Sequence, residues 1–196
     1  SFLSLIFFIL RKKGTQMKII YVPSYGLSRK DQSRPTCMSL DTAIKGLKMM
    51  KEGLGDKIVF STAYKWWGIE AALKKRLSRE YGIEDSLVEI ISGATLERTT
   101  SYIEAIGLSK IVDPDDEIVV VGQEYHAERA ADALRYLFEK VDVVKVPTSM
   151  ERILDPSWLK SVLCSSSMLS FILYNWFLNI ITPYMMRREI RKQKGG

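Results

Sequence analysis

The chain has few of the side chains from which metal and redox sites are built. It contains one histidine, His126, and two cysteines, Cys37 and Cys164, which are far apart in the sequence. A histidine-rich zinc site is therefore excluded, and the cysteine spacing matches no metal or redox motif. The clustered aspartates of a magnesium-dependent phosphotransfer site are also missing. We expect no metal site, and both cysteines are interpreted as structural thiols.

Three motifs of nucleotide-binding and hydrolytic proteins are also missing. The sequence contains no GxGxxG, no GxxxxGK[ST] and no GxSxG. The first two absences weaken a dinucleotide or P-loop interpretation, and the third weakens an α/β-hydrolase interpretation. The sequence alone does not decide whether the protein is an enzyme.

The positive charge is concentrated near the two ends of the chain. Of the net charge of +6, residues 11–13 contribute +3 and residues 187–194 contribute +4, so the rest carries −1. Nucleic-acid-binding proteins usually carry a basic stripe across a folded face, so we expect no nucleic-acid partner. Each basic cluster instead adjoins an apolar run, which favours an anionic membrane surface as a partner.

Short apolar runs alternate with helical patterns through the middle of the chain. The runs predict strands at residues 17–23, 57–62, 87–92, 117–122 and 141–146. Helical spacing predicts helices at 36–53, 66–77, from 93 to about 110, and from the break at Gly122–Gln123 to 140. This alternation predicts an α/β fold. We expect an open, Rossmann-like parallel sheet of five strands, in the order 3-2-1-4-5, with helices on both faces.

The domain organisation expected from the sequence has three parts. Residues 1–16 form an apolar and basic extension, residues 17–150 the Rossmann-like domain, and residues 151–196 a long apolar C-terminal helix with a basic tail. Residues 161–186 contain no charged side chain. This uncharged segment is long enough to span a membrane, although its serines and asparagines lower its hydrophobicity. Three alternatives stay open: a transmembrane helix, a helix on the membrane surface, and a helix buried against the domain. The expected location is cytoplasmic or membrane-associated, and the oligomeric state is undetermined.

Small and polar residues follow the predicted strands. At the carboxyl end of the first strand they are Ser24, Tyr25 and Gly26, of the second Ser61, Thr62, Ala63 and Tyr64, of the third Gly93, Ala94 and Thr95, and of the fourth Gly122 and Gln123. Ligands of such sheets bind at the carboxyl ends of the strands, so we expect these residues to surround a ligand.

His126 and Arg129 lie in the first turns of the helix that follows the fourth predicted strand. A separation of three residues places both side chains on one surface, near the free N–H groups and positive dipole of the helix N-terminus. This combination suits a small anionic ligand. We expect Arg129 to bind a carboxylate or phosphate, and His126 to stay neutral beside the dipole and act as a proton-transfer group. The alternative is that His126 only packs the turn and Arg129 pairs with Glu128 or Asp132.

Residues 119–134, VVVGQEYHAERAADAL, resemble the YH-x-x-RA segment of the YdcF/SanA/ElyC-like domains of unknown function. Tyr125, His126, Arg129 and Ala130 carry the match. KIVFSTAY at 57–64 resembles the family's second strand. Three further residues correspond by resemblance to family positions: Arg34 before the first helix, and Thr95 and Glu97 as a Thr-x-Glu element, for which Thr99 or Thr100 gives an alternative register. The chain departs from the family where the glycine cluster after strand one is reduced to Gly26, and where Ser61–Thr62 replaces Ser-Gly.

The resemblance implies a small-molecule pocket at the strand ends. S-adenosylmethionine binding has been ascribed to one branch of the family, and a role in cell-envelope biology to others. Two functions stay open. One is a binding or catalytic domain for a small anionic metabolite or nucleotide-type ligand. The other is a membrane-associated accessory protein of the cell envelope that has no activity of its own. Convergence of the candidate residues on one open cleft would favour the first.

Overall fold

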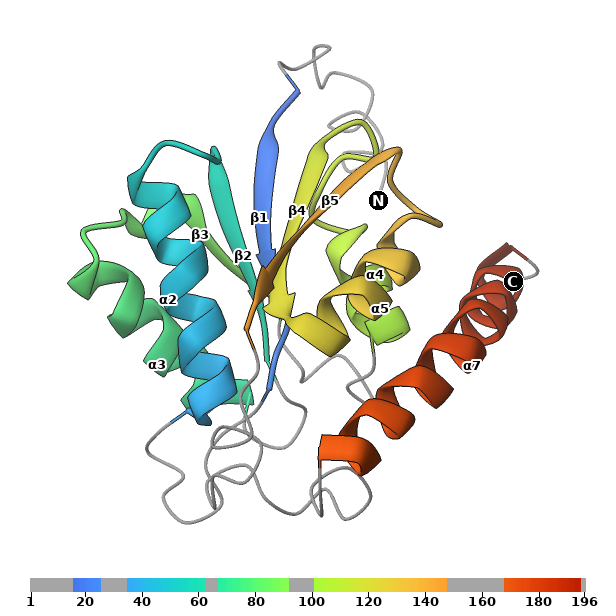
Figure 1. Cartoon of the computed structure of the whole chain (residues 1–196). Coiled ribbons are helices and arrows are strands. Elements are labelled where there is room, and N and C mark those ends of the chain that lie inside the picture. The colour runs from blue at the N-terminus through green and yellow to red at the C-terminus, as the bar shows by residue number, and fades with distance from the viewer. Residues whose placement is uncertain (1–15, 26–34, 63–66, 92–100, 148–167, 195–196) are drawn as a thin grey trace.

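Five parallel strands form a single sheet in the computed structural model (Figure 1), which describes residues 16–25, 35–62, 67–91, 101–147 and 168–194. The order is β3-β2-β1-β4-β5, and every neighbouring pair is parallel. The strands are β1 Lys18–Val22, β2 Lys57–Ser61, β3 Val88–Ile91, β4 Glu117–Gln123 and β5 Lys140–Val146. The predicted fold class, strand order and parallel pairing are therefore confirmed.

Helices cover both faces of this sheet, as predicted. They are α2 Cys37–Lys51, α3 Trp67–Glu80, α4 Ser101–Leu108, α5 Glu124–Leu134 and α7 Met168–Lys194, with a short 3-10 helix, η2 Asp85–Leu87, before β3. Figure 1 shows α2 and α3 on one side of the sheet and α4, α5 and α7 on the other. Strands β1, β2 and β3 follow one another toward one edge of the sheet, and the chain then returns to place β4 on the other side of β1. The direction in which strands are added therefore reverses between β1 and β4. Ligands of open α/β sheets bind at the carboxyl end of such a switch point.

The strands are apolar on both faces because both faces are buried. Ile20 and Val22 of β1 pack in the cluster that includes Leu47 of α2, whereas Ile19 and Tyr21 pack in the cluster of α4 and α5. Successive side chains of a strand point to opposite faces, so one strand supplies both layers of the core.

The helix predicted to run from Gln123 to Lys140 is shorter in the structure. α5 ends at Leu134, and Lys140 already belongs to β5. The backbone N–H groups of Leu137 and Phe138 both donate to the carbonyl of Leu134, which closes a turn. Phe138 is 3% exposed and packs into the core, so its apolar character reflects burial of this turn and not a further helical turn.

The C-terminal helix α7 lies against α5 and α4 (Figure 1). Met186 on its inner face is fully buried in the core cluster that contains the α5 alanines. The helix continues through Pro183, and the hydroxyl of the preceding Thr182 donates to the carbonyl of Leu178 at 2.7 Å. No helix of the described residues is long and apolar enough to cross a membrane, so the transmembrane alternative for residues 161–186 finds no support in the part described.

Candidate functional site

A cavity of about 320 Å³ lies at the carboxyl end of the sheet, between the strand ends and α7. This volume is at the lower end of the range typical of small-molecule pockets. Three parts of the chain form its polar side and α7 its apolar side. The lining residues are Ser24 after β1, Ser101, Tyr102 and Glu104 of α4, His126 and Arg129 of α5, and Leu178, Ile181, Thr182 and Met185 of α7.

The abrupt passage from β4 into α5 places His126 and Arg129 at this cavity. Gly122 allows it: a Cβ at this position would lie 3.1 Å from atoms of Ala127 and 3.2 Å from the hydroxyl of Tyr25. Those distances are tight for a side chain, so a glycine lets strand, helix and Tyr25 approach one another. Ala127 faces the core, and the helix then presents His126 and Arg129 toward the cavity.

A chain of hydrogen bonds fixes the imidazole of His126. The Tyr25 hydroxyl accepts the backbone N–H of Gln123 at 2.7 Å and lies 2.9 Å from Nδ1 of His126. We assign the Tyr25 proton to this second bond, because Nδ1 of His126 is the one acceptor that the described residues offer this hydroxyl. The histidine proton then sits on Nε2 and is donated to Oγ of Ser101, 3.2 Å away. Arg129 donates from Nε to the same oxygen at 3.4 Å.

Both Tyr25 and His126 are uncharged near neutral pH. Burial lowers the pKa of His126 well below its usual range, and the positive charge of Arg129 lowers it further. Burial also raises the pKa of Tyr25 above its usual value, against the effect of the Gln123 N–H. The sequence predicted a neutral His126, and the direction is confirmed. The causes are burial and Arg129, whereas we had expected the helix dipole.

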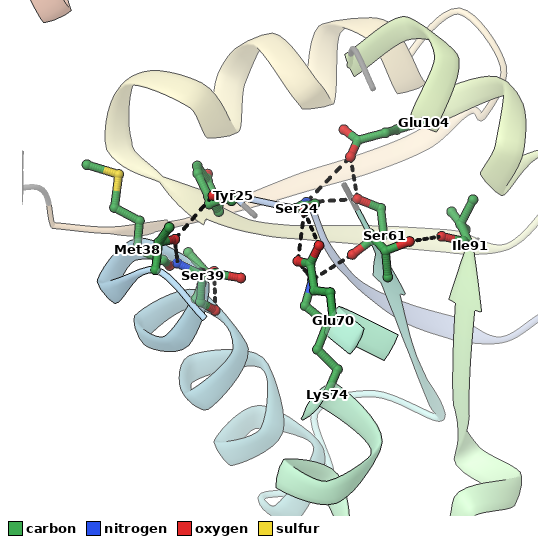
Figure 2. Close-up of polar contacts among 12 residues, drawn as sticks. Ser24, Tyr25, Met38, Ser39, Ser61, Glu70, Lys74, Ile91 and Glu104 are labelled. Carbon is green, nitrogen blue, oxygen red and sulfur yellow. Dashed lines mark hydrogen bonds and ion pairs between the residues drawn. The ribbon is translucent and has the colours of Figure 1, made fainter. Parts of the chain in front are cut away.

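Glu104 is a buried carboxylic acid that lines the cavity and is 3% exposed. Figure 2 shows its contacts with Ser24 and Ser61. The Ser61 hydroxyl donates to it, and the backbone N–H of Ser24 lies 3.4 Å from its Oε1. Burial raises the pKa of Glu104 from 4.5 to about 7, although Ser61, Ser24 and the charge of Lys74 act in the opposite direction. A carboxyl group with such a pKa can accept or donate a proton near neutral pH.

A second buried carboxylate, Glu70, lies on the other side of Ser24 (Figure 2). The Ser24 hydroxyl donates to its two oxygens at 2.8 and 3.0 Å. Lys74 forms an ion pair with Glu70 at 2.8 Å and donates to the Ser61 carbonyl at 2.6 Å. Glu70 and Lys74 come from α3 and Glu104 from α4, which cover opposite faces of the sheet. The ends of β1 and β2 are therefore held by polar groups from both layers.

The structure brings three of the predicted site residues, Ser24, His126 and Arg129, to the cavity wall. Tyr25 does not line the cavity but contacts His126, which does. Ser61 likewise donates a hydrogen bond to Glu104, which lines the cavity. The Thr62 hydroxyl donates instead to the Ile91 carbonyl between β2 and β3. The predicted residues Gly26, Arg34, Ala63, Thr95 and Glu97 lie outside the described residues, as does the side chain of Tyr125.

The expected alternative pairing of Arg129 with acidic neighbours also differs from the structure. Asp132 pairs with Arg135, and Glu128 pairs with Lys145 at 2.9 Å. The side chain of Arg129 turns toward the cavity and Ser101 instead. His126 does pack the turn through Tyr25, so a structural role and exposure to the cavity coexist in this residue.

Sequence reasoning missed Ser101, Glu104, Glu70 and Lys74. Glu104 is the one charged residue of α4, SYIEAIGL, where it sits between apolar neighbours. A single acid inside an apolar helix is a signal of burial that could have been used. Glu70 and Lys74 form an i,i+4 pair that resembles an ordinary exposed pair, so their burial had no signal in the sequence.

Three comparisons with known proteins found no match. No protein-family model, no curated protein and no solved structure matches the chain. In the described residues, no three side chains of histidine, cysteine, aspartate or glutamate come together as metal ligands would. The resemblance to the YdcF/SanA/ElyC-like domains stays a prediction from the sequence.

Proposed function

We propose that this protein binds a small anionic metabolite in the cavity between the strand ends and α7. The observation that carries the proposal is the meeting of Arg129, His126, Ser101, Ser24 and Glu104 around one cavity at the carboxyl end of the sheet. These residues come from three parts of the chain between positions 24 and 129, so contacts within one helix do not explain why they lie together. Of the two functions left open by the sequence, this convergence favours a binding or catalytic domain.

Each group has a distinct part in the proposed binding. Arg129 is 9% exposed and carries the positive charge that would hold a carboxylate or phosphate. Neutral His126 and the hydroxyl of Ser101 would orient polar atoms of the ligand. Glu104 would accept a hydrogen bond from a ligand hydroxyl or amine, or a proton if the ligand is turned over.

The walls of the cavity set the size and polarity of the ligand. A volume of about 320 Å³ suits a compact metabolite or part of a nucleotide-type ligand. Leu178, Ile181 and Met185 offer an apolar surface opposite the charged groups. A ligand with an anionic group at one end and an apolar portion at the other would match both sides. S-adenosylmethionine, which the family resemblance implies, belongs in the set to be tested.

The test begins with mass spectrometry of ligands retained through purification. A thermal-shift screen of nucleotides, S-adenosylmethionine and phosphosugars follows. Calorimetric titration of a hit then compares the parent protein with Arg129→Ala and with Arg76→Ala, a matched loss of an exposed arginine on α3. We expect weaker binding in the first variant alone. Equal affinity of all three proteins for the ligand would place its site elsewhere.

A further inference from the structure

The helix α7 has two different apolar faces. Its inner face contributes Leu178, Ile181 and Met185 to the cavity and Met186 to the core. Lining the cavity and packing in the core therefore account for these residues. They do not account for the second set of large apolar side chains, which points away from the domain.

The outer face is a continuous stripe, here called the outer stripe of α7. It begins with five large apolar residues that are between 54% and 70% exposed: Leu173, Trp176, Phe177, Ile180 and Tyr184. It continues with the exposed Arg187, Arg188 and Arg191. Steps of three or four residues separate successive members, apart from adjacent pairs, so all eight lie along one side of the helix. Ile180, Tyr184 and the three arginines also line one shallow hollow, together with Pro183.

Single exposed apolar residues are common on soluble proteins, whereas a contiguous stripe of them usually marks a contact surface. Three features of the stripe indicate what it contacts. Trp176 and Tyr184 are the residue types enriched at the boundary between lipid headgroups and acyl chains. Leu173, Phe177 and Ile180 supply an apolar area that would enter that boundary. The arginines supply positive charge that attracts anionic headgroups.

A second copy of the chain fits the same stripe less well. Two stripes paired in parallel would bring the arginines of both copies together. Paired antiparallel, each arginine cluster would cover the apolar half of the other stripe, which includes no acidic residue. Both arrangements leave the arginine charges uncompensated, whereas an anionic lipid surface compensates them.

We propose that α7 docks the protein on an anionic lipid surface through its outer stripe, with the helix axis along the surface. The domain and the cavity would then face away from the lipid, because they lie on the opposite side of α7. This proposal goes beyond metabolite binding and does not depend on it. Arg129→Ala, which tests the cavity, is expected to leave lipid binding unchanged.

The experiment is co-sedimentation of the full chain with vesicles of phosphatidylcholine, alone or with about one third phosphatidylglycerol. We expect sedimentation with the anionic vesicles only, and weaker binding as salt is raised. The double variant Arg187→Glu/Arg188→Glu should lower vesicle binding at least tenfold. The control is Arg76→Glu, another exposed arginine, on α3, whose reversal should have little effect.

The apolar half of the stripe needs its own variant. Trp176→Ser should lower binding several-fold, whereas Leu54→Ser, at another exposed apolar residue, should not. In the parent, lipids with brominated acyl chains should quench tryptophan fluorescence, and Trp176→Phe should remove most of that quenching. All of the variants in these two vesicle experiments change exposed side chains, and circular dichroism checks that each variant is folded.

Three results would overturn the proposal. The first is vesicle binding unchanged in both the Arg187→Glu/Arg188→Glu and Trp176→Ser variants. The second is binding that these variants retain but that Phe7→Ser/Arg11→Glu abolishes, because residues 1–13 also join an apolar run to a basic cluster. The third is a dimer in analytical ultracentrifugation that Trp176→Ser dissociates, with no vesicle binding by the parent. That result would make a second copy of the chain the occupant of the stripe.

Discussion

Glu104 should make the stability of this protein depend on pH in a range where most carboxylates do not. Its pKa is about 7 in the folded protein against 4.5 ordinarily, chiefly because burial disfavours the charged form. Below pH 4.5 the acid is protonated in both folded and unfolded chains. As the pH rises, the unfolded chain loses the proton first, so the folded state loses relative stability until the pH passes 7.

The magnitude follows from the same two pKa values. Each pKa unit corresponds to about 1.4 kcal/mol, so the charged form of Glu104 costs the folded state about 3 kcal/mol. Between pH 5 and pH 8 most of this, ~2–3 kcal/mol, should be lost from the free energy of unfolding. That is a large share of the total stability of an ordinary domain. Solvent hardly reduces the cost of this charge, because the Glu104 side chain is 3% exposed.

Glu104→Gln isolates this contribution. Glutamine keeps an oxygen that can accept from Ser61 and from the Ser24 N–H, but it carries no charge at any pH. We expect parent and variant to differ little at pH 5, and the variant to be the more stable by up to ~2–3 kcal/mol at pH 8. Urea unfolding at a series of pH values measures both. Glu80→Gln, an exposed glutamate on α3, should instead follow the parent at every pH.

An equal difference in stability between parent and Glu104→Gln at pH 5 and at pH 8 would contradict this prediction. Burial would then not hold the proton on this carboxyl group, and water or a neighbouring charge would have to stabilise its ionised form. Carbon-13 NMR of labelled glutamate side chains provides a direct check, because one carboxyl resonance should titrate near pH 7.

Three further predictions concern the site. Arg129→Ala should weaken binding of an anionic ligand by about 1.5–3 kcal/mol in calorimetry, whereas Arg129→Lys should lose less because it keeps the charge; equal losses would show that charge is not the property recognised. Tyr25→Phe removes the hydroxyl between the Gln123 N–H and His126; we expect nitrogen-15 NMR of the imidazole to show a mixture of tautomers, and an unchanged spectrum would contradict our assignment. Lys74→Met removes the buried ion pair with Glu70 and the hydrogen bond to the Ser61 carbonyl, so urea unfolding should show a loss of about 3–5 kcal/mol; a loss below 1 kcal/mol would mean that this ion pair contributes little to the stability.

The sheet could be predicted from the sequence because its evidence is local. Each strand is a short apolar run, and each connecting helix has a clear apolar side, as Ala127, Ala130, Ala131 and Leu134 of α5 illustrate. Parallel strands with right-handed crossovers leave few possible orders. The end of α5 could not be predicted, since Leu137 and Phe138 fit the helical spacing equally well whether they continue the helix or pack under a turn.

His126 and Arg129 could be proposed for the site for the same reason. Their roles depend on their position in one helical turn after one strand, which the sequence displays directly. Tyr25 is different, since its contact with His126 joins residues 101 positions apart. The sequence placed both at strand ends, but only the three-dimensional structure pairs the Tyr25 hydroxyl with the imidazole and brings Ser101 beside it at the cavity wall.

The apolar neighbours of Glu104 in α4 signal its burial, but they do not tell which groups it meets. The family resemblance directed attention to Glu97, which lies outside the described residues, whereas the acid that meets Ser24 and Ser61 comes from within α4. A glutamate on a helix is ordinarily a solvated residue, and its environment changes only when strands from elsewhere in the chain enclose it. The property that makes Glu104 chemically useful, a pKa of about 7, is thus created by tertiary burial and not by its sequence neighbours. For that reason the titration of Glu104 is the measurement that would show whether this buried acid exchanges a proton near neutral pH.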